Sequence, residues 1–348
     1  MPRNVIIAIG VIFFGIIAFD MMGIIVRLLG DTYPILQIAA MRNFFGMMPA
    51  LILLAHARQF AALPRLNQPR LHAINLLRST SVVVAQLSFY TALTKIEFAT
   101  AGALGFSGPI FITALSVPLL GHVVGVWRWS AIFIGFAGVL TIMQPFNDGF
   151  SAYMVLPVIA AFCYALSSIL VRLYPQDMPS AAIQLSQQVM TCVLATLAML
   201  VFFDPVAITG ASDAGLIVMM GAFGGTGVMC LVIAYRLADP SSVSPFEYFG
   251  IPVSFALGWL FFSEAPFDDL FPGILFIVGA GMIIMARERR EQRLIAPAAF
   301  LCPPPPKTSF ENLFTSKLPL DLSEILIMFS LEFSVKIAAN LIFFIESP

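Results

Sequence analysis

The chain has 348 residues, of which 59% are apolar and only 11% are charged, and its mean hydropathy is +0.95. Soluble domains contain about half apolar and about a quarter charged residues, so this composition excludes an ordinary soluble protein and predicts an all-α integral membrane protein. The net charge of −1 lacks the basic surplus that nucleic-acid binding requires, and no nucleic-acid partner is expected.

Ten apolar stretches lie between clusters of charged and turn-forming residues, each about as long as the roughly 20 residues that a membrane-spanning helix needs. They occupy residues 5–29, 35–55, 72–94, 99–120, 127–145, 152–173, 181–203, 213–235, 241–262 and 270–286. The first is too long for the apolar part of a cleaved signal peptide, and no small-residue cleavage site follows it. The sequence therefore predicts ten transmembrane helices.

The orientation follows from the Lys/Arg bias of the short loops. With the N-terminus in the cytoplasm, the outer side keeps only Arg27 and Lys95. The inner side then collects Arg3, Arg58, Arg65, Arg70, Arg128, Arg172, Arg236, Arg287, Arg289, Arg290 and Arg293. Both ends of the ten-helix core are predicted to be cytoplasmic. We expect a multi-pass protein of the plasma membrane, which is the inner membrane in a bacterium.

The chain contains an internal repeat. The segment "IIVRLLGDTYP" at 24–34 matches "ILVRLYPQDMP" at 169–179, and further on Pro109 falls on Pro252. We predict two five-helix repeats, residues 1–146 and 147–293. Because five is odd, the second repeat enters the membrane from the opposite side, an arrangement that secondary transporters use with the site between the repeats. A duplicated scaffold without transport is the alternative.

The two matched prolines point to the site. Pro109 and Pro252 each follow a glycine closely and lie in mid-span. Proline removes a helix hydrogen bond and kinks the helix, and matched breaks in two halves are typical of a transporter's binding site. We expect the fourth and ninth helices to bend at a cavity.

Four ionisable residues lie inside the predicted spans: Asp20, Arg42, Arg78 and Glu247. Each costs at least ~2.5–3.5 kcal/mol at the bilayer centre, so an intramembrane charge indicates function by default. At about 1.5 Å per residue, Asp20 and Arg42 lie at similar depths below the outer face, and Arg78 and Glu247 at similar depths above the inner face. We expect one acid–base pair toward each face, gating the cavity or coupling an ion. Fixed structural bridges are the alternative.

Polar and aromatic residues in the same helices are candidates for gripping a small heterocyclic or amino-acid-like solute. They are Gln86, Tyr90, Ser107, Tyr164, Ser168, Thr226 and Tyr248. Ligand sites are mostly apolar with a few placed polar groups, and aromatic faces suit flat rings. Hydrogen bonding between helices is the alternative for each residue.

Several glycines are expected to allow close helix packing rather than to bind a ligand. They are Gly135, Gly138, Gly221, Gly225, Gly279 and Gly281.

No metal site, disulfide or cofactor is expected. The cysteines Cys163, Cys192, Cys230 and Cys302 lie singly, and the histidines His56, His72 and His122 lie in or beside polar connections. Zinc requires three or four converging ligands. No nucleophile–base pair lies within the spans, so we expect no enzymatic activity.

The segment 294–348 differs in character from the rest. "CPPPPK" at 302–307 predicts an extended polyproline linker, and residues 323–345 form an apolar stretch that carries Glu332 and Lys336. We favour a helix lying on the membrane surface for this stretch over an eleventh span.

The pattern resembles a known family. Ten spans in two inverted halves, "AFDMMGIIVRLLG", "ATAGALGFSGPIFITALSVPLLG" and "SPFEYFGIPVSFALGWLFFSE" are similar to the EamA-domain branch of the drug/metabolite transporter superfamily, over residues 1–290. Two features depart from its pattern: Gly121-His122 stands where many members have Gly-Glu, and the segment after Arg293 is additional.

The resemblance implies a secondary transporter that moves a small organic metabolite by alternating access, with a proton or cation as a possible coupling partner. The acid in the first helix, the arginine in the second and the "SPFEYF" run look most like the riboflavin and S-adenosylmethionine importers. Export of amino acids or drugs is the alternative, and a non-transporting receptor or assembly protein is an alternative from another class. Substrate, direction, coupling ion and oligomeric state stay open.

Overall fold

The computed structural model describes residues 3–286, apart from 121–125, 144–150, 209, 239–245, 248–249, 265–269, 281 and 284–285. Within this part the secondary structure is entirely helical, without a strand. The segment 294–348, with its predicted linker and surface helix, lies outside the described residues, and so does Tyr248.

The helices follow one another along the chain with short connections. The first half contains α1 (Arg3–Leu29), α2 (Ile35–Gly46), α3 (Met48–Ala57), η1 (Phe60–Asn67), α4 (Pro69–Lys95), α5 (Phe98–Gly105), α6 (Gly108–Leu120) and α7 (Val126–Met143). The second contains η2 (Ala152–Met154), α8 (Val155–Leu170), η3 (Val171–Leu173), α9 (Ser180–Phe202), α10 (Ala211–Leu237) and α12 (Gly250–Phe262). Residues 273–280 are also helical.

In the described part, 6 helical stretches are long and apolar enough to cross a membrane. They are Ile6–Leu29, Ile35–Ala57, Phe98–Leu119, Ala152–Leu173, Ser180–Phe202 and Ala211–Leu237. Ile132–Ile142 and Gly250–Phe262 are apolar but shorter. The prediction of an all-α, multi-pass membrane protein is confirmed, whereas the ten spans, the repeats and the orientation stay predictions.

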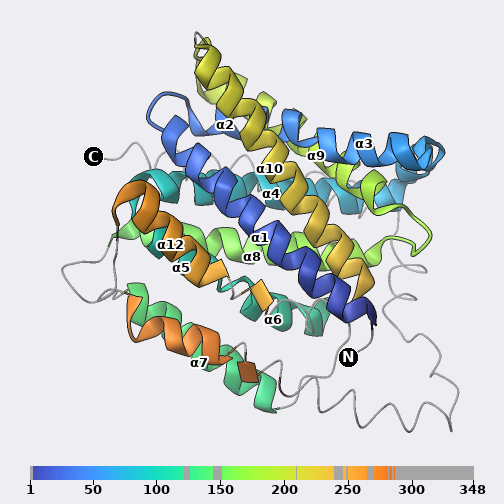
Figure 1. The fold of residues 1–348 in the computed structure, drawn as a ribbon. Coiled ribbons are helices and arrows are strands. Elements are labelled where there is room, and N and C mark those ends of the chain that lie inside the picture. Colours follow the sequence, from blue (N-terminus) through green and yellow to red (C-terminus); the bar gives the residue numbers. More distant parts are fainter. Residues whose placement is uncertain are drawn as a thin grey trace, which may run out of the picture.

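The predicted span 72–94 corresponds to α4, which is not among those six stretches. This helix is long but polar, because it carries Asn75, Arg78 and Gln86 on its buried side. It packs against α8 and α9 in the middle of the bundle, so other helices cover most of its surface (Figure 1). Its polar residues therefore face protein rather than lipid.

The expected bend of the fourth span is present as a break at Phe106–Ser107, just before Pro109, within the stretch Phe98–Leu119. The predicted span 99–120 is two helices, α5 and α6, and Pro109 is the second residue of α6. The Ser107 carbonyl accepts hydrogen bonds from the amides of Ile110 (3.0 Å) and Phe111 (3.4 Å), which begins the new helix. Pro252 is the third residue of α12 and is exposed. A proline in the first turn removes no hydrogen bond, because those amides have no intrahelical partner.

Figure 1 shows α1 lying along α10, with α2 packed on α9 and α10, while α7 and residues 273–280 form a separate pair at the edge of the bundle. Glycines permit these close approaches. A Cβ on Gly225 would lie 2.2 Å from the Gly46 carbonyl oxygen, and one on Gly138 would lie 2.6 Å from that of Gly273. At Gly279 nothing lies within 4 Å, so the packing prediction is wrong there.

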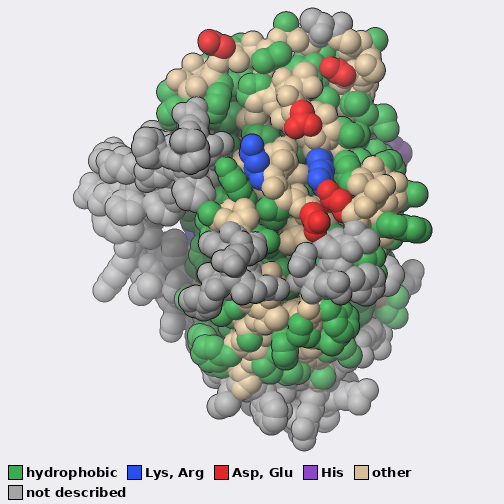
Figure 2. All heavy atoms as spheres, turned by 90° about the vertical axis from the view of Figure 1, so that its left-hand side faces the viewer, with side chains coloured by type: hydrophobic (Ala, Val, Ile, Leu, Met, Phe, Trp, Pro, Cys, Tyr) green, Lys and Arg blue, Asp and Glu red, His purple; other side chains and the backbone are tan. Residues whose placement is uncertain are grey.

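Side-chain contacts in the connections and at the helix ends define two ends of the bundle. At the Arg27 end, Tyr33 Oη donates to Asp213 Oδ2 (2.8 Å), and Arg27 pairs with Glu264. Figure 2 looks onto this end, where acidic and basic side chains gather among hydrophobic and neutral ones.

At the Arg65 end, Arg65 Nη2 donates to Asp177 Oδ2 (2.6 Å), and Arg236 Nη2 donates to the Gln176 carbonyl (2.8 Å). Arg65 and Arg236, both predicted to be cytoplasmic, thus lie at one end, and Arg27, predicted to be on the outer side, lies at the other.

Candidate functional site

A cavity of about 220 Å³ lies where helices of both halves meet. One face of α4 lines it with Arg78, Val82, Gln86, Phe89 and Leu93, spaced at helical intervals of three and four. At about 1.5 Å per residue this stripe extends for roughly 22 Å, so the lining runs along much of the bundle. The other walls come from α1, α2, α5, α6, α8, α9, α10 and α12.

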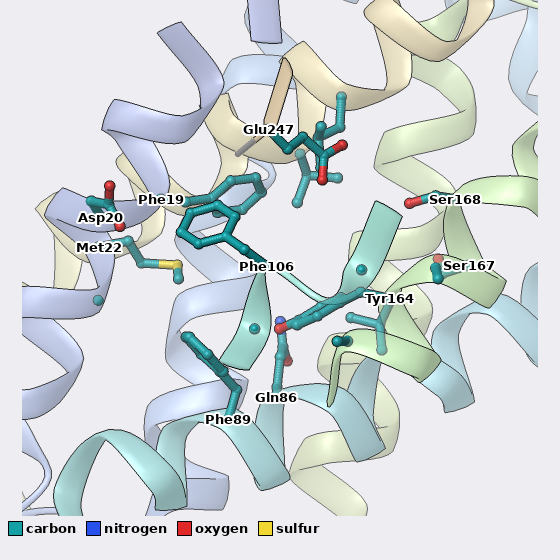
Figure 3. Close-up of a pocket in the computed structure, with 18 of the residues that line it drawn as sticks. Phe19, Asp20, Met22, Gln86, Phe89, Phe106, Tyr164, Ser167, Ser168 and Glu247 are labelled. Carbon is teal, nitrogen blue, oxygen red and sulfur yellow. The ribbon is translucent and has the colours of Figure 1, made fainter. Parts of the chain in front are cut away.

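Aromatic rings form much of the wall, including those of Phe19, Phe89, Phe106 and Tyr164. Figure 3 shows the Phe106 ring in the middle of the group, with Asp20 on one side and Tyr164 on the other. The break between α5 and α6 places Phe106 there, because the chain leaves α5 at Gly105 and begins α6 at Gly108. Such a wall suits a flat organic ring.

Asp20 lies on α1 and is buried, with 9% of its surface exposed. Its Oδ1 accepts a hydrogen bond from Ser254 Oγ on α12 (2.8 Å). Its Oδ2 is buried and has no hydrogen-bond partner. The carboxyl thus bridges the two halves with one oxygen and leaves the other free.

Arg42 is buried, and each of its side-chain nitrogens has a hydrogen-bond acceptor. Its Nη1 donates to Asn43 Oδ1 (3.0 Å) and Gln188 Oε1 (3.1 Å), its Nη2 to the Gly224 carbonyl (2.8 Å), and its Nε to Met22 Sδ (3.4 Å). A Cβ on Gly224 would lie 2.4 Å from Arg42 Nε, so only glycine leaves room for the guanidinium. Arg42 ties α2 to α1, α9 and α10.

Arg78 has fewer partners and is 1% exposed. Its Nε donates to the Ser167 carbonyl (3.1 Å) and its Nη2 to Gln187 Oε1 (2.6 Å). The guanidinium lies over the Tyr174 ring, 5.5 Å from the centroid. Its Nη1 is buried without a hydrogen-bond partner.

Glu247 is half-buried and lines the cavity. Its Oε1 accepts a short hydrogen bond from Tyr235 Oη on α10. In Figure 3 it lies on the far side of Phe19 and Phe106 from Met22.

The two acid–base pairs expected from depth are not formed. The ion pairs of the described residues are Arg27–Glu264 and Arg65–Asp177. Equal depth did not bring Asp20 to Arg42 or Arg78 to Glu247, because amides, carbonyls and hydroxyls of neighbouring helices occupy these groups instead. For Arg42, the fixed network of hydrogen bonds agrees with the alternative stated above, in which the residue has a structural role.

The cavity unites seven of the predicted site residues: Asp20, Arg42, Arg78, Gln86, Tyr164, Ser168 and Glu247. Tyr90 does not line the cavity; it is fully buried, and its Oη lies 3.7 Å from Met22 Sδ. Ser107, Thr226 and Pro252 are not in the lining, and Pro109 follows the lining residue Gly108.

An amide cluster was missed by sequence reasoning. Asn43 and Gln86 exchange hydrogen bonds (2.8 and 3.3 Å), while Gln187 holds Arg78 and Gln188 holds Arg42. The signal was present as "QLSQQ" at 184–188, where three amides interrupt an apolar helix. Ser254, the partner of Asp20, gave no comparable signal.

A second missed group is the Glu264 cluster at the Arg27 end. Glu264 accepts a bidentate pair from Arg27, with Nη1 to Oε2 at 2.8 Å, and also accepts from the Phe98 amide (2.9 Å). The Arg27 guanidinium lies 4.3 Å from the centroid of the Phe262 ring. Three helices, α1, α5 and α12, are thus joined at one point.

The described residues contain no group of three or more His, Cys, Asp or Glu side chains placed to hold a metal ion. Fold and cavity together define a multi-pass helical membrane protein with an internal cavity lined by aromatic, amide and charged groups.

Comparison with known proteins makes the class specific. Residues 5–144 match the EamA-like transporter family. A riboflavin transporter of Rhizobium johnstonii is 31% identical over 218 residues, which cover 62% of this chain and 71% of that protein. The chain belongs to the EamA-like transporter family, within the drug/metabolite transporter superfamily.

Other relatives differ in the solute that they carry. An S-adenosylmethionine uptake transporter of Rickettsia prowazekii is 21% identical over 76% of this chain and 87% of its own. The pseudopaline exporter CntI of Pseudomonas aeruginosa is 25% identical over 77% and 90%. One crystal structure shares the fold at a TM-score of 0.61 and 19% identity, covering 82% of this chain and 98% of the other.

Proposed function

We propose that the protein is a secondary transporter that moves a small organic metabolite across the plasma membrane by alternating access. Its ten helices form two inverted repeats, residues 1–146 and 147–293, which rock about the cavity. The observation that carries the proposal is that the cavity's polar contacts cross between the halves: Asp20 to Ser254, Arg42 to Gln188, and Arg78 to Gln187. Sites between repeats are typical of secondary transporters.

Uptake of a riboflavin-like or S-adenosylmethionine-like solute is favoured by the relatives of those names. Both solutes carry a flat heteroaromatic ring, and Phe89, Phe106 and Tyr164 supply aromatic faces for it. Export of amino acids or drugs is the second candidate, supported by the similarity to the pseudopaline exporter.

The cavity volume of about 220 Å³ lies below the ~300–1,000 Å³ typical of sites for drug-sized ligands. A solute with two or three fused rings therefore needs a wider cavity than this conformation offers. We interpret the conformation as closed around the site, with opening as a separate step.

Asp20 is our candidate for the residue that binds the coupling ion. A buried carboxylate with an oxygen that lacks a partner is expensive in a membrane interior. A bound proton or cation removes that cost, so occupancy of Asp20 favours the arrangement in which it is buried against Ser254. Glu247, which already accepts from Tyr235, is the second candidate.

Flux in proteoliposomes tests the proposal. Purified full-length protein is assayed with riboflavin, S-adenosylmethionine and amino acids, in both directions, with and without a proton gradient. We expect uptake of one ring-bearing solute that an inward proton gradient accelerates. Asp20→Asn should abolish the acceleration, whereas Asp31→Asn, an exposed acid after α1, should leave it intact.

The outcomes separate the alternatives. Gradient-driven efflux would favour the exporter, and equal flux with and without the gradient would exclude proton coupling. Absence of flux for every solute would leave a non-transporting receptor or assembly protein.

A further inference from the structure

The cavity is lined by two buried arginines that differ in how completely they are hydrogen-bonded. Arg42 is 2% exposed and each of its three side-chain nitrogens has an acceptor. Arg78 is 1% exposed, and its Nη1 has none. Every side-chain nitrogen of Arg42 thus has an acceptor from the protein, with four hydrogen bonds in all, whereas Arg78 has two and its Nη1 has none.

The charge of Arg78 is also unmatched. Neither ion pair of the described residues includes it, and Glu247, the acid nearest in the expected scheme, bonds Tyr235 instead. The neighbours that do contact Arg78 are neutral: the Ser167 carbonyl, the Gln187 amide and the Tyr174 ring. A buried charge without a counter-ion, with an unsatisfied donor, is strongly disfavoured unless another group completes it.

The guanidinium is also held in place. Nε and Nη2 are bonded to two different helices, α8 and α9, and the backbone carbonyl of Gln187 accepts from Ser79 Oγ (3.3 Å), which ties α4 to α9 at the residue whose side chain holds Arg78. Arg78 is one of the residues that line the cavity, and its guanidinium is suited to a carboxylate or phosphate, because these anions accept charge-assisted hydrogen bonds from a guanidinium.

We propose that Arg78 is the subsite for an anionic group of the transported solute, so that the substrate class is a flat-ringed metabolite with a carboxylate or phosphate. This inference rests on the proposed transport function. The anion takes the Nη1 donors and neutralises the guanidinium, while the ring of the solute lies against the aromatic wall toward Phe106. Arg42 takes no part in binding and holds the wall together.

The test measures binding of two matched pairs of probes to purified full-length protein in detergent. The first pair is riboflavin and riboflavin 5′-phosphate, which differ in a phosphate. The second is S-adenosylmethionine and its decarboxylated analogue, which differ in a carboxylate. Each dissociation constant is measured for wild type, Arg78→Gln, Arg78→Lys and Arg70→Gln. Arg70 is the matched control, because it is exposed in the first turn of the same helix.

In wild type the anionic member of at least one pair should bind roughly 10- to 100-fold more tightly than its partner, the range expected for hydrogen bonds to a charged group. The pair that shows the preference identifies the anion as phosphate or carboxylate. Arg78→Gln should reduce the ratio to about one, Arg78→Lys should keep part of it, and Arg70→Gln should keep all of it.

Several results would overturn the inference. Equal binding within both pairs by wild type excludes the anion subsite without any variant, and so does a preference that survives in Arg78→Gln. In either case the solute still binds, and the proposed function stands. Binding of none of the four probes overturns the anion subsite and the substrate proposal together.

Discussion

The ion pair between Arg27 and Glu264 closes the bundle at one end, and its loss should open the cavity to that side. Glu264 accepts two hydrogen bonds from Arg27 and a third from the Phe98 amide, so it joins α1 of the first half to α5 and to the end of α12. Seven residues before Arg27, Asp20 is bonded to Ser254 on the same α12. Two contacts thus hold α1 and α12 together, one in the cavity wall and one at the Arg27 end of the bundle.

The coupling energy of the Arg27–Glu264 pair can be estimated from how deeply its side chains are buried. The side chains of Arg27 and Glu264 are 22% and 17% exposed, so the pair is neither a surface pair nor a fully buried one. Exposed pairs contribute about 0.2–1 kcal/mol and breaking a buried pair costs about 3–5 kcal/mol, so we expect a coupling energy of about 1–3 kcal/mol. If the pair exists only in the closed conformation, its loss raises the open population roughly 5- to 150-fold.

Two assays measure this effect. A double-mutant cycle with Arg27→Gln and Glu264→Gln, followed by thermal unfolding in detergent, gives the coupling energy. For access, Leu93→Cys is placed in a chain whose native cysteines are replaced by alanine, because Leu93 lines the cavity. A membrane-impermeant maleimide applied at the Arg27 end should label it faster when Glu264 is Gln.

The matched control is the exposed pair Arg65–Asp177 at the other end, whose side chains are 46% and 65% exposed. Its cycle should show a weaker coupling, and its loss should not change the labelling of Leu93→Cys. Unchanged labelling in Glu264→Gln, or a coupling no larger than that of the control, would refute the closing role of Arg27 and Glu264.

Two further predictions concern stability. Gly225→Ala should destabilise the protein by about 1–3 kcal/mol, because the new Cβ would lie 2.2 Å from the Gly46 oxygen. Gly279→Ala meets nothing within 4 Å in a helical segment and should leave the melting temperature unchanged or slightly higher. Equal melting temperatures of the two variants would contradict the close approach at Gly225. The hydrogen bond from Arg65 lowers the pKa of Asp177, so the pair should stabilise the fold above the usual aspartate pKa of about 4 and lose this effect as pH falls below it. Asp177→Asn should remove that part of the pH dependence of melting, and an unchanged profile would count against it.

Composition and span length were enough to predict an all-α membrane protein, because a lipid interior leaves few alternatives for the backbone. The prolines indicated a bend in the fourth span but not its form. A proline in an apolar run is compatible with a kink in one helix or with the start of a second, and the choice depends on whether the preceding residue ends a helix. At Ser107 the chain restarts, with its carbonyl accepting from Ile110 and Phe111.

Depth alone could not predict the partners of the buried charges. Two residues at one depth lie anywhere around the bundle, and the rotation of each helix decides which side chains meet. Arg27 and Glu264, conversely, form a pair that the sequence did not predict. Arg27 was placed on the outer side by the charge bias, yet only the fold shows that it pairs with Glu264.

The two cavity arginines show what the sequence leaves undetermined and why it matters for function. Both interrupt a predicted span and carry the same insertion cost, so the sequence weighs them equally. The difference lies in the neighbours: Arg42 meets a glycine carbonyl, two amides and a thioether, while Arg78 meets one carbonyl, one amide and a ring face. An arginine whose nitrogens all have acceptors in its own protein needs no ligand in the conformation described here. One whose donors are unfilled is stabilised when the cavity is occupied by an anion, and this dependence is what selective binding requires.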